Sequence, residues 1–211
     1  MRKIALCAFA LMLGIALCAA PSMAADRVIA SFEKDAEGWE VPEWALEKTD
    51  HVAKSVAPSA DVAKDGKQSL KMDTEFPGKV WTAAIVETME SFDFTPYTDI
   101  SADVYLPKEA PQGLKAKIIM TVGENWKWTE MSRAVSVVPG QWTTLTASLA
   151  PGSTNWQRTT VDDNFRKDIR KIAIRVESNK KPEYKGPIYI DNIKVFTSTA
   201  VVAAPAANAG K

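Results

Sequence analysis

Two tryptophans, Trp126 and Trp128, stand two positions apart in the polar segment GENWKWTE, which runs from Gly123 to Glu130. On a β-strand, residues two positions apart share one face of the sheet, so Trp126, Trp128 and Glu130 would lie together. Exposed indole rings stack against the C–H faces of sugar rings, whose hydroxyl groups need charged or amide partners. The spacing is suited to carbohydrate recognition, although a tryptophan pair on a strand is equally compatible with a core position.

Other segments supply polar partners and further aromatic surface. In DISADVYLP, Asp103 and Tyr105 alternate with an apolar set, and in KIAIRVES the same holds for Arg175 and Glu177. Trp81 lies in KVWTAAIVE, where both alternating sets are mainly apolar, so we expect one face in the core and the other covered by a loop or a ligand. The candidate ligand-binding residues are Trp81, Trp126, Trp128, Tyr105, Asp103, Arg175 and Glu177.

The inventory of nucleophiles gives little support for an enzyme. His51 is the only histidine, and both cysteines, Cys7 and Cys18, fall in the first 24 residues. A Ser-His-Asp triad would have to use His51, but no Gly-x-Ser-x-Gly elbow lies near it, and KTDHVAKS has the composition of a polar strand end. We interpret His51 as a solvated or hydrogen-bonded structural residue.

Carboxylates are abundant enough that a glycosidase is an alternative function, because that chemistry needs only two of them at a fixed separation. Glu124 with Glu130, or Asp103 with Glu177, are candidate pairs. A zinc site is disfavoured, since one histidine and no cysteine beyond the first 24 residues leave only oxygen ligands. The chain also has no phosphate-binding glycine loop.

The N-terminal residues have the pattern of a secretory signal peptide over residues 1–24. Two basic residues precede an apolar run from Ile4 to Ala20, and small residues follow, so we expect cleavage after Ala24. An uncleaved membrane anchor and a lipoprotein attached at Cys18 are the alternatives. Cleavage would leave an exported domain, periplasmic or extracellular, with neither cysteines nor a membrane span.

The 26 basic residues balance the 26 acidic ones, a composition that suggests neither a nucleic-acid partner nor an anionic membrane. We expect one folded domain from Asp26 to Phe196, which is long enough for a substantial core. Residues 197–211, TSTAVVAAPAANAGK, should form a flexible Ala-rich tail, because they offer no apolar face to bury.

Alternation of apolar and polar residues dominates the folded part, and long helical periodicity is scarce. The β-rich segments are DISADVYLP, LKAKIIMTV, KIAIRVES, RVIASFE, SLKMDTEF, KVWTAAIVE, AVSVVPGQWTTLTASL and GPIYIDNIKVF. Pro139-Gly140 predicts a hairpin over Ala134 to Leu149, and VDDNFRKDIRK should hold at most one helical turn. About nine or ten such strands predict an all-β fold, an antiparallel two-sheet sandwich or jelly roll.

Two acidic residues, Glu33 in ASFEKD and Asp191 in IYIDNIKV, lie at or beside the first and last predicted strands. These strands often lie side by side in an antiparallel sandwich, and two carboxylates brought together would repel unless a cation or a basic residue bridged them. Oxygen ligands suit calcium. The pattern alone nevertheless favours two solvated strand-end acids over a metal site.

Six segments carry a family resemblance when they are taken in order: SFEKDAEGW, GKQSLKM, DFTPYTDISADVYLP, VPGQWTTLTASL, IRKIAIRVES and GPIYIDNIKVF. Together they resemble carbohydrate-binding modules with the galactose-binding-like jelly-roll fold, such as the family 11, family 27 and family 4 types. The resemblance spans Ile29 to Phe196. It specifies the fold better than the ligand, since domains similar to the complex I intermediate-associated protein share the pattern and bind no sugar.

The resemblance implies a structural calcium ion that joins the first and last strands. Its ligands would be Glu33, Asp191 and backbone carbonyl groups of the loop around Lys64 and Asp65. The resemblance also implies a ligand on the concave sheet, bound by aromatic residues from several strands. The best matches for that role are Trp81, Trp126 and Trp128.

We therefore expect an exported, non-catalytic module that binds a polysaccharide or oligosaccharide on a tryptophan-bearing concave sheet face. Modules that it resembles usually accompany a catalytic domain, so a separate glycoside hydrolase is an expected partner. Two alternatives stay open: a small jelly-roll glycosidase or polysaccharide lyase, and an envelope structural or assembly domain without a sugar ligand.

Overall fold

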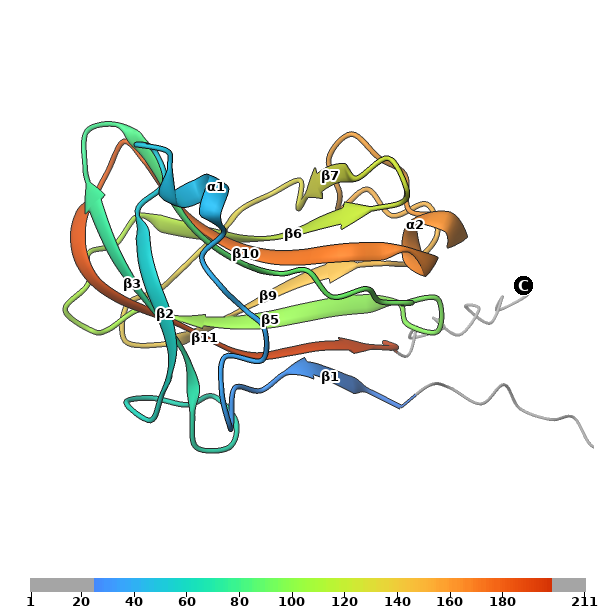
Figure 1. The fold of residues 1–211 in the computed structure, drawn as a ribbon, viewed down its shortest axis with the longest axis horizontal. Helices are drawn as coiled ribbons and strands as arrows, with labels where there is room; N and C mark the ends of the chain where they lie inside the picture. The colour runs from blue at the N-terminus through green and yellow to red at the C-terminus, as the bar shows by residue number, and fades with distance from the viewer. Residues whose placement is uncertain (1–24, 199–211) are drawn as a thin grey trace, which may run out of the picture.

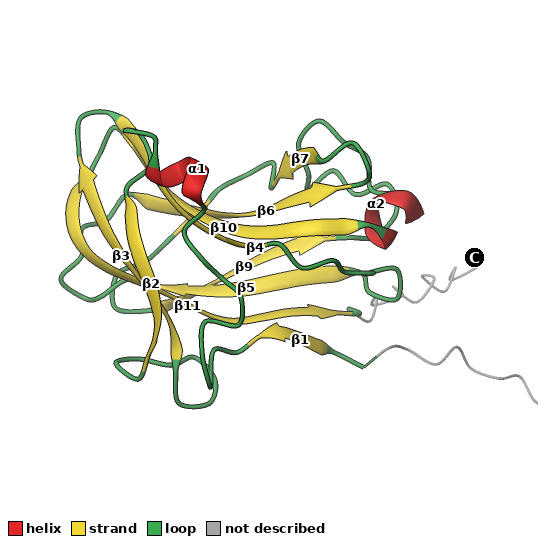
Figure 2. Cartoon of the chain, viewed as in Figure 1, coloured by secondary structure: helices red, strands yellow, loops and turns green. Residues whose placement is uncertain are grey.

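The computed structural model describes residues 25–198 (Figure 1). The expected signal peptide and all but the first two residues of the expected tail lie outside this range. Within it, the strands form two antiparallel sheets packed face to face, and helix is confined to two short segments (Figure 2). The predicted all-β, two-sheet sandwich is confirmed. No helix among the described residues is long and apolar enough to cross a membrane.

The first sheet has six strands, and we call it the six-stranded sheet. In spatial order it contains β2 (Ala53–Ser59), β3 (Ser69–Pro77), β11 (Glu183–Phe196), β5 (Asp99–Tyr105) and β9 (Trp142–Ser148), with β1 (Arg27–Ala30) paired to β11. The pairing of β1 with β11 places the first and last strands side by side, as expected from the sequence.

The second sheet, the five-stranded sheet, lies above the first in Figure 1. Its strands are β4 (Trp81–Thr88), β10 (Ile169–Asn179), β6 (Leu114–Val122) and β7 (Lys127–Glu130), with β8 (Val135–Ser136) paired to β6. A short helix, α2 (Asp163–Lys167), precedes β10, and the Asp162 side chain caps it by accepting a hydrogen bond from the Phe165 N–H at 2.7 Å. This helix is the single turn that the sequence predicts.

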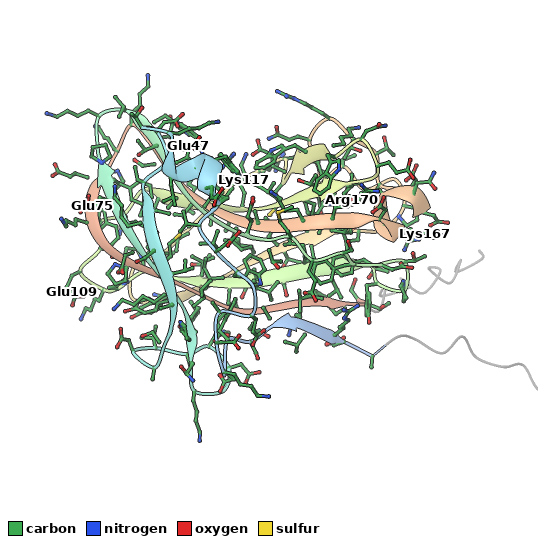
Figure 3. All side chains as sticks on the ribbon, in the orientation of Figure 1. Glu47, Glu75, Glu109, Lys117, Lys167 and Arg170 are labelled. Carbon is green, nitrogen blue, oxygen red and sulfur yellow. The ribbon has the colours of Figure 1, made fainter. Side chains whose placement is uncertain are left out.

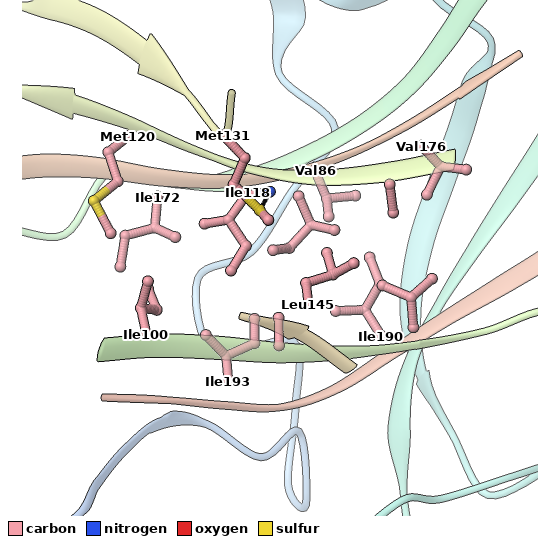
Figure 4. Close-up of a cluster of buried hydrophobic side chains, with 14 of the residues drawn as sticks. Val86, Ile100, Ile118, Met120, Met131, Leu145, Ile172, Val176, Ile190 and Ile193 are labelled. Carbon is pink, nitrogen blue, oxygen red and sulfur yellow. Dashed lines mark hydrogen bonds between the residues drawn. The ribbon is translucent and has the colours of Figure 1, made fainter. Parts of the chain in front are cut away.

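The core lies between the two sheets and follows from the alternation in the strands. Ile172 and Ile118 of the five-stranded sheet face Ile100 and Ile190 of the six-stranded sheet (Figure 4), and all four side chains are fully buried. Burying a side chain of this size stabilises the fold by about 1.5–3 kcal/mol. The outward-facing residues of the same strands are therefore free to be polar.

The outward face of the five-stranded sheet is an exception, because its centre is also apolar. Ile85, Ile119 and Ala173 are buried there under Ala45 of α1 (Glu43–Leu46), a four-residue helix that crosses this face. This arrangement explains why both alternating sets of β4 are apolar. One set faces the core, and the other lies partly under α1.

The predicted hairpin over Ala134 to Leu149 is wrong. The first of its two β-rich runs, β8, pairs with β6 in the five-stranded sheet, whereas the second, β9, pairs with β5 in the six-stranded sheet. The chain does turn at Gly140, which has φ +76° and donates a hydrogen bond from its N–H to the Leu106 carbonyl at 2.8 Å. The turn therefore connects the two sheets and does not join two neighbouring strands of one sheet.

Candidate functional site

A groove of about 520 Å³ lies on the outward face of the five-stranded sheet, between α1 and β7. Figure 3 labels Lys117 beside α1 and Arg170 near α2. The residues that line the groove are aromatic or charged with few exceptions: Trp44, Lys48, Asp50, His51, Trp81, Thr121, Trp126, Trp128, Lys171 and Arg175. Its volume is within the range of ligand-binding pockets.

Four aromatic rings follow one another across the groove, and we call them the aromatic series. The ring centroids of Trp81 and His51 are 6.3 Å apart, those of His51 and Trp44 4.9 Å, and those of Trp44 and Trp128 6.4 Å. Each pair meets edge to face, a favourable geometry for aromatic rings. Trp81 is 37% exposed and Trp128 41% exposed, so large parts of these rings face solvent instead of the core.

Strand register explains how Trp128 reaches the groove. Trp128 lies opposite Thr121, and Glu130 lies opposite Ile119, so Trp128 and Glu130 share the outward face as the sequence predicts. Trp126 precedes β7 and occupies a tight turn in which its N–H donates to the Gly123 carbonyl at 3.0 Å. It lines the groove from that turn and not from the strand.

A network of ion pairs forms the floor beside the aromatic series. Arg175 Nη2 lies 2.5 Å from Glu130 Oε2 and 3.0 Å from Glu177 Oε2, and Lys117 Nζ lies 3.4 Å from Glu130 Oε1. Lys171 pairs in the same way with the buried Glu87. Among the described residues, the buried Nε of Arg175 has no hydrogen-bond partner. The charged groups of the floor are therefore held in place by ion pairs.

His51 lies in the groove because residues 50–52 run along the edge of β4. The Val52 N–H donates to the Ala83 carbonyl at 2.8 Å, and the Ala83 N–H donates to the Asp50 carbonyl at 2.9 Å. The His51 Nδ1 is 2.8 Å from Asp50 Oδ1, and this hydrogen bond lowers the pKa of Asp50 below its ordinary value. His51 is hydrogen-bonded, as interpreted from the sequence, but it also lines the groove.

Sequence reasoning missed Trp44 and His51 as members of the site. A signal for Trp44 was present, because it lies between acidic residues in PEWALEK, and polar neighbours were the criterion that singled out Trp126 and Trp128. The same criterion would also select Trp156, which has polar neighbours in GSTNWQRT. Trp156 is only 3% exposed, however, and donates its Nε1–H to the Ser148 carbonyl at 2.8 Å. Trp156 belongs to the core.

The expectation that Asp103 and Tyr105 share the groove with Arg175 and Glu177 is wrong. Both residues lie on β5, on the outward face of the six-stranded sheet. The Tyr105 ring packs 5.4 Å from Trp142, and the buried Asp103 accepts a hydrogen bond from Asn192 Nδ2 at 2.8 Å. The candidate pair Asp103 and Glu177 is therefore divided between opposite faces of the sandwich and cannot act on one substrate.

The two acids expected to bind calcium meet at one loop. Glu33 accepts hydrogen bonds from the N–H groups of Lys67 at 2.9 Å and Gln68 at 3.0 Å, and Asp191 accepts from those of Lys64 at 2.7 Å and Asp65 at 3.1 Å. Burial raises the pKa of Asp191, and the nearby Glu33 charge adds to this rise.

Each of these two carboxylates keeps lone pairs that the N–H groups do not use. No cluster of three or more His, Cys, Asp or Glu side chains with metal-ligand geometry occurs in residues 25–198. A cation here would therefore have two carboxylates and backbone carbonyl oxygens as its protein ligands, a donor set that fits calcium.

Comparison with known proteins gives one family match. The family model described as "mannanase, galactose-binding domain-like" matches residues 30–192. No curated protein sequence matches the chain.

Solved structures with the same fold include several carbohydrate-binding modules. A family 28 module specific for non-crystalline cellulose superposes with a TM-score of 0.57 at 14% identity, covering 80% of this chain and 93% of the module. The family 11 module of a Clostridium thermocellum cellulosomal cellulase gives a TM-score of 0.51 at 16% identity, covering 84% of this chain and 97% of the module. A family 27 module studied for specific mannan recognition gives a TM-score of 0.50 at 17% identity, covering 84% of this chain and 98% of the module. These likenesses establish the jelly-roll fold.

Proposed function

The chain belongs to the mannanase galactose-binding-domain-like family, and on that premise we propose that it is a non-catalytic module that binds a polysaccharide or oligosaccharide in the groove. The observation that carries this proposal is the aromatic series from Trp81 to Trp128 above a floor of ion pairs. Indole faces can stack on sugar rings, while the charged groups that line the groove can bind hydroxyl groups.

The length of the groove favours a chain of sugars over a single sugar. Trp81 is in register with Asn179 of β10, and Thr121, the partner of Trp128, is in register with Lys171. These backbone positions are eight residues apart along β10, but the side chains converge, because successive ring-centroid distances of 6.3, 4.9 and 6.4 Å place the Trp81 and Trp128 rings within about 18 Å of each other. An extended ligand can therefore contact aromatic rings at both ends of the aromatic series.

The two carboxylates that hold Arg175 of the groove support binding without catalysis. Glu130 and Glu177 are both ion-paired to the same guanidinium group of Arg175. A glycosidase needs one carboxyl group as an acid and another as a base or nucleophile, on either side of the scissile bond. Two carboxylates held by one arginine instead form a fixed polar surface for recognition.

We take β-mannan as the first ligand class to examine, because the family model is named for mannanases. The signal-peptide pattern at the N-terminus supports export to the periplasm or the exterior, where such polysaccharides are met. There the module would act beside a separate glycoside hydrolase. Its contribution would be to hold that enzyme's substrate, which would raise the local concentration of the polysaccharide near the enzyme.

The test is affinity electrophoresis in gels that contain galactomannan, glucomannan, xylan or mixed-linkage β-glucan. We expect retardation in at least one mannan gel and its loss in Trp44→Ala and Trp128→Ala. Trp142→Ala is the matched control, because Trp142 is a partly exposed tryptophan on the other sheet. Failure of every glycan to retard the wild-type protein would overturn the proposal. Release of reducing ends or unsaturated products would show an enzyme instead.

We also propose that Glu33 and Asp191 hold a structural calcium ion. Their carboxylates share one loop, and the repulsion that contributes to the raised pKa of Asp191 is the kind that a bound cation relieves. Gly66 allows the loop to approach the Glu33 carboxylate this closely, because a Cβ atom there would lie 2.4 Å from Glu33 Oε1. The ion would tie the start of the domain to β11.

A further inference from the structure

Trp126 lies at the end of the groove beyond Trp128 and is separate from the aromatic series. It lines the groove and is 49% exposed, more than Trp81 or Trp128. An indole ring that is half exposed contributes little to the core, and keeping it in water costs hydrophobic free energy. A ligand that covers the ring would recover this free energy.

The Trp126 ring is held in place from one side. Its backbone has φ +50°, a left-handed conformation that is unusual for a bulky residue. The guanidinium carbon of Arg170 lies 5.4 Å from the ring centroid, over the ring. Asp168 holds that guanidinium group with two contacts of 3.0 Å, from Nε to Oδ1 and from Nη2 to Oδ2. The stack leaves the other face of the ring available in a fixed orientation.

A second cavity, of about 500 Å³, begins at the turn that carries Trp126. Gly123 and Glu124 of the turn line it together with Asn164, Lys167 and Asp168. Figure 3 labels Arg170 and Lys167 at this end of the molecule, near α2. Asp168 therefore belongs both to the arginine stack and to the cavity. An amide, two carboxylates and an ammonium group in one open cavity are suitable partners for sugar hydroxyl groups.

We propose that Trp126, backed by Arg170, is an outer subsite at which a sugar residue of a long chain stacks after it leaves the groove. The inference rests on the proposed function and adds to it a preference for ligand length. A short oligosaccharide fills the aromatic series alone, whereas a longer one also covers Trp126 and extends toward the cavity at α2. The module is thereby suited to internal stretches of a polymer.

The experiment compares a short and a long ligand on the wild-type protein and on variants, by isothermal titration calorimetry with mannotriose and mannohexaose. For Trp126→Ala we expect the affinity for mannohexaose to fall about tenfold, since one ring face loses its partner, while that for mannotriose changes less than about twofold. Trp126→Phe, which keeps a smaller ring, should lie between the wild type and Trp126→Ala. Melting temperatures measured in parallel verify that each variant is folded.

Two controls separate the outcomes. Trp128→Ala should lower the affinity for both ligands, and Trp142→Ala should lower the affinity for neither. If the wild-type protein binds neither oligosaccharide, the proposed mannan-binding function fails and the subsite fails with it. If the wild type binds but Trp126→Ala lowers the affinity for both ligands equally, or for neither, the function stands and the outer subsite is refuted.

Discussion

Replacing Arg175 with methionine should destabilise the domain as well as its groove. The Arg175 guanidinium group contacts Glu130 at 2.5 Å and Glu177 at 3.0 Å, and its side chain is only 13% exposed. Methionine fills a similar volume but leaves Glu177 without its salt-bridge partner and Glu130 with Lys117 alone. Removing one partner of a fully buried pair costs about 3–5 kcal/mol, and since the two carboxylates keep 18% and 15% exposure, we expect about 2–3 kcal/mol.

Urea unfolding followed by tryptophan fluorescence measures this loss. With a urea dependence of about 2–3 kcal/mol per molar for a domain of this size, the midpoint should fall by about 1 M. Lys54→Met is the matched control, because Lys54 pairs with Glu75 at 3.8 Å with 54% and 44% of the two side chains exposed. That variant should lose less than about 1 kcal/mol.

A further variant identifies the cause of the loss. If the cost comes from uncompensated carboxylates, Arg175→Met combined with Glu177→Gln should recover part of the stability that Arg175→Met loses. The reasoning is refuted if the midpoint of Arg175→Met shifts no more than that of Lys54→Met. It is also refuted if the double variant is no more stable than Arg175→Met alone.

Three more predictions concern stability. Calcium added to chelator-treated protein should raise the melting temperature, and Glu33→Gln should remove that rise; a wild-type melting temperature that does not respond to calcium would exclude the site. In chelator, ionisation of Asp191 should oppose folding because its folded-state pKa is raised above the ordinary 3.8, so Asp191→Asn should gain stability relative to wild type as the pH rises through and above that ordinary value; urea midpoints that run parallel would contradict this. Trp156→Phe should cost about 1 kcal/mol by thermal or urea unfolding, since it leaves the half-buried Ser148 carbonyl without its indole donor.

The sequence predicts the fold well because burial imposes a period of two on each strand. Ile172, Ile174 and Val176 are inward-facing and fully buried, as their alternation with polar residues indicates. The same pattern cannot say to which sheet a strand belongs. Asp103 and Glu177 both project outward, but from opposite sheets, and for the same reason the two runs beside Gly140 were predicted to form one hairpin.

The candidate site was predictable only where strands supply it. Trp81 and Trp128 reach the groove through strand register. Trp44 reaches it on α1, whose four residues are too few to show any helical period, and whose position depends on Ala45 packing over Ile85 and Ile119. Such a contact joins segments far apart in sequence, so the local sequence pattern does not predict it.

The pairing of β1 with β11 has a practical consequence for anyone who attaches another molecule to this domain. Arg27 lies opposite Val195, so the described chain enters and leaves at one end of the six-stranded sheet, while the groove opens on the outward face of the other sheet (Figure 1). A fluorescent label or a surface tether joined beside Arg27 or Phe196 would therefore lie on the six-stranded sheet, away from the sheet that carries the groove. The domain can be immobilised or tagged from that side with the groove still open to a glycan.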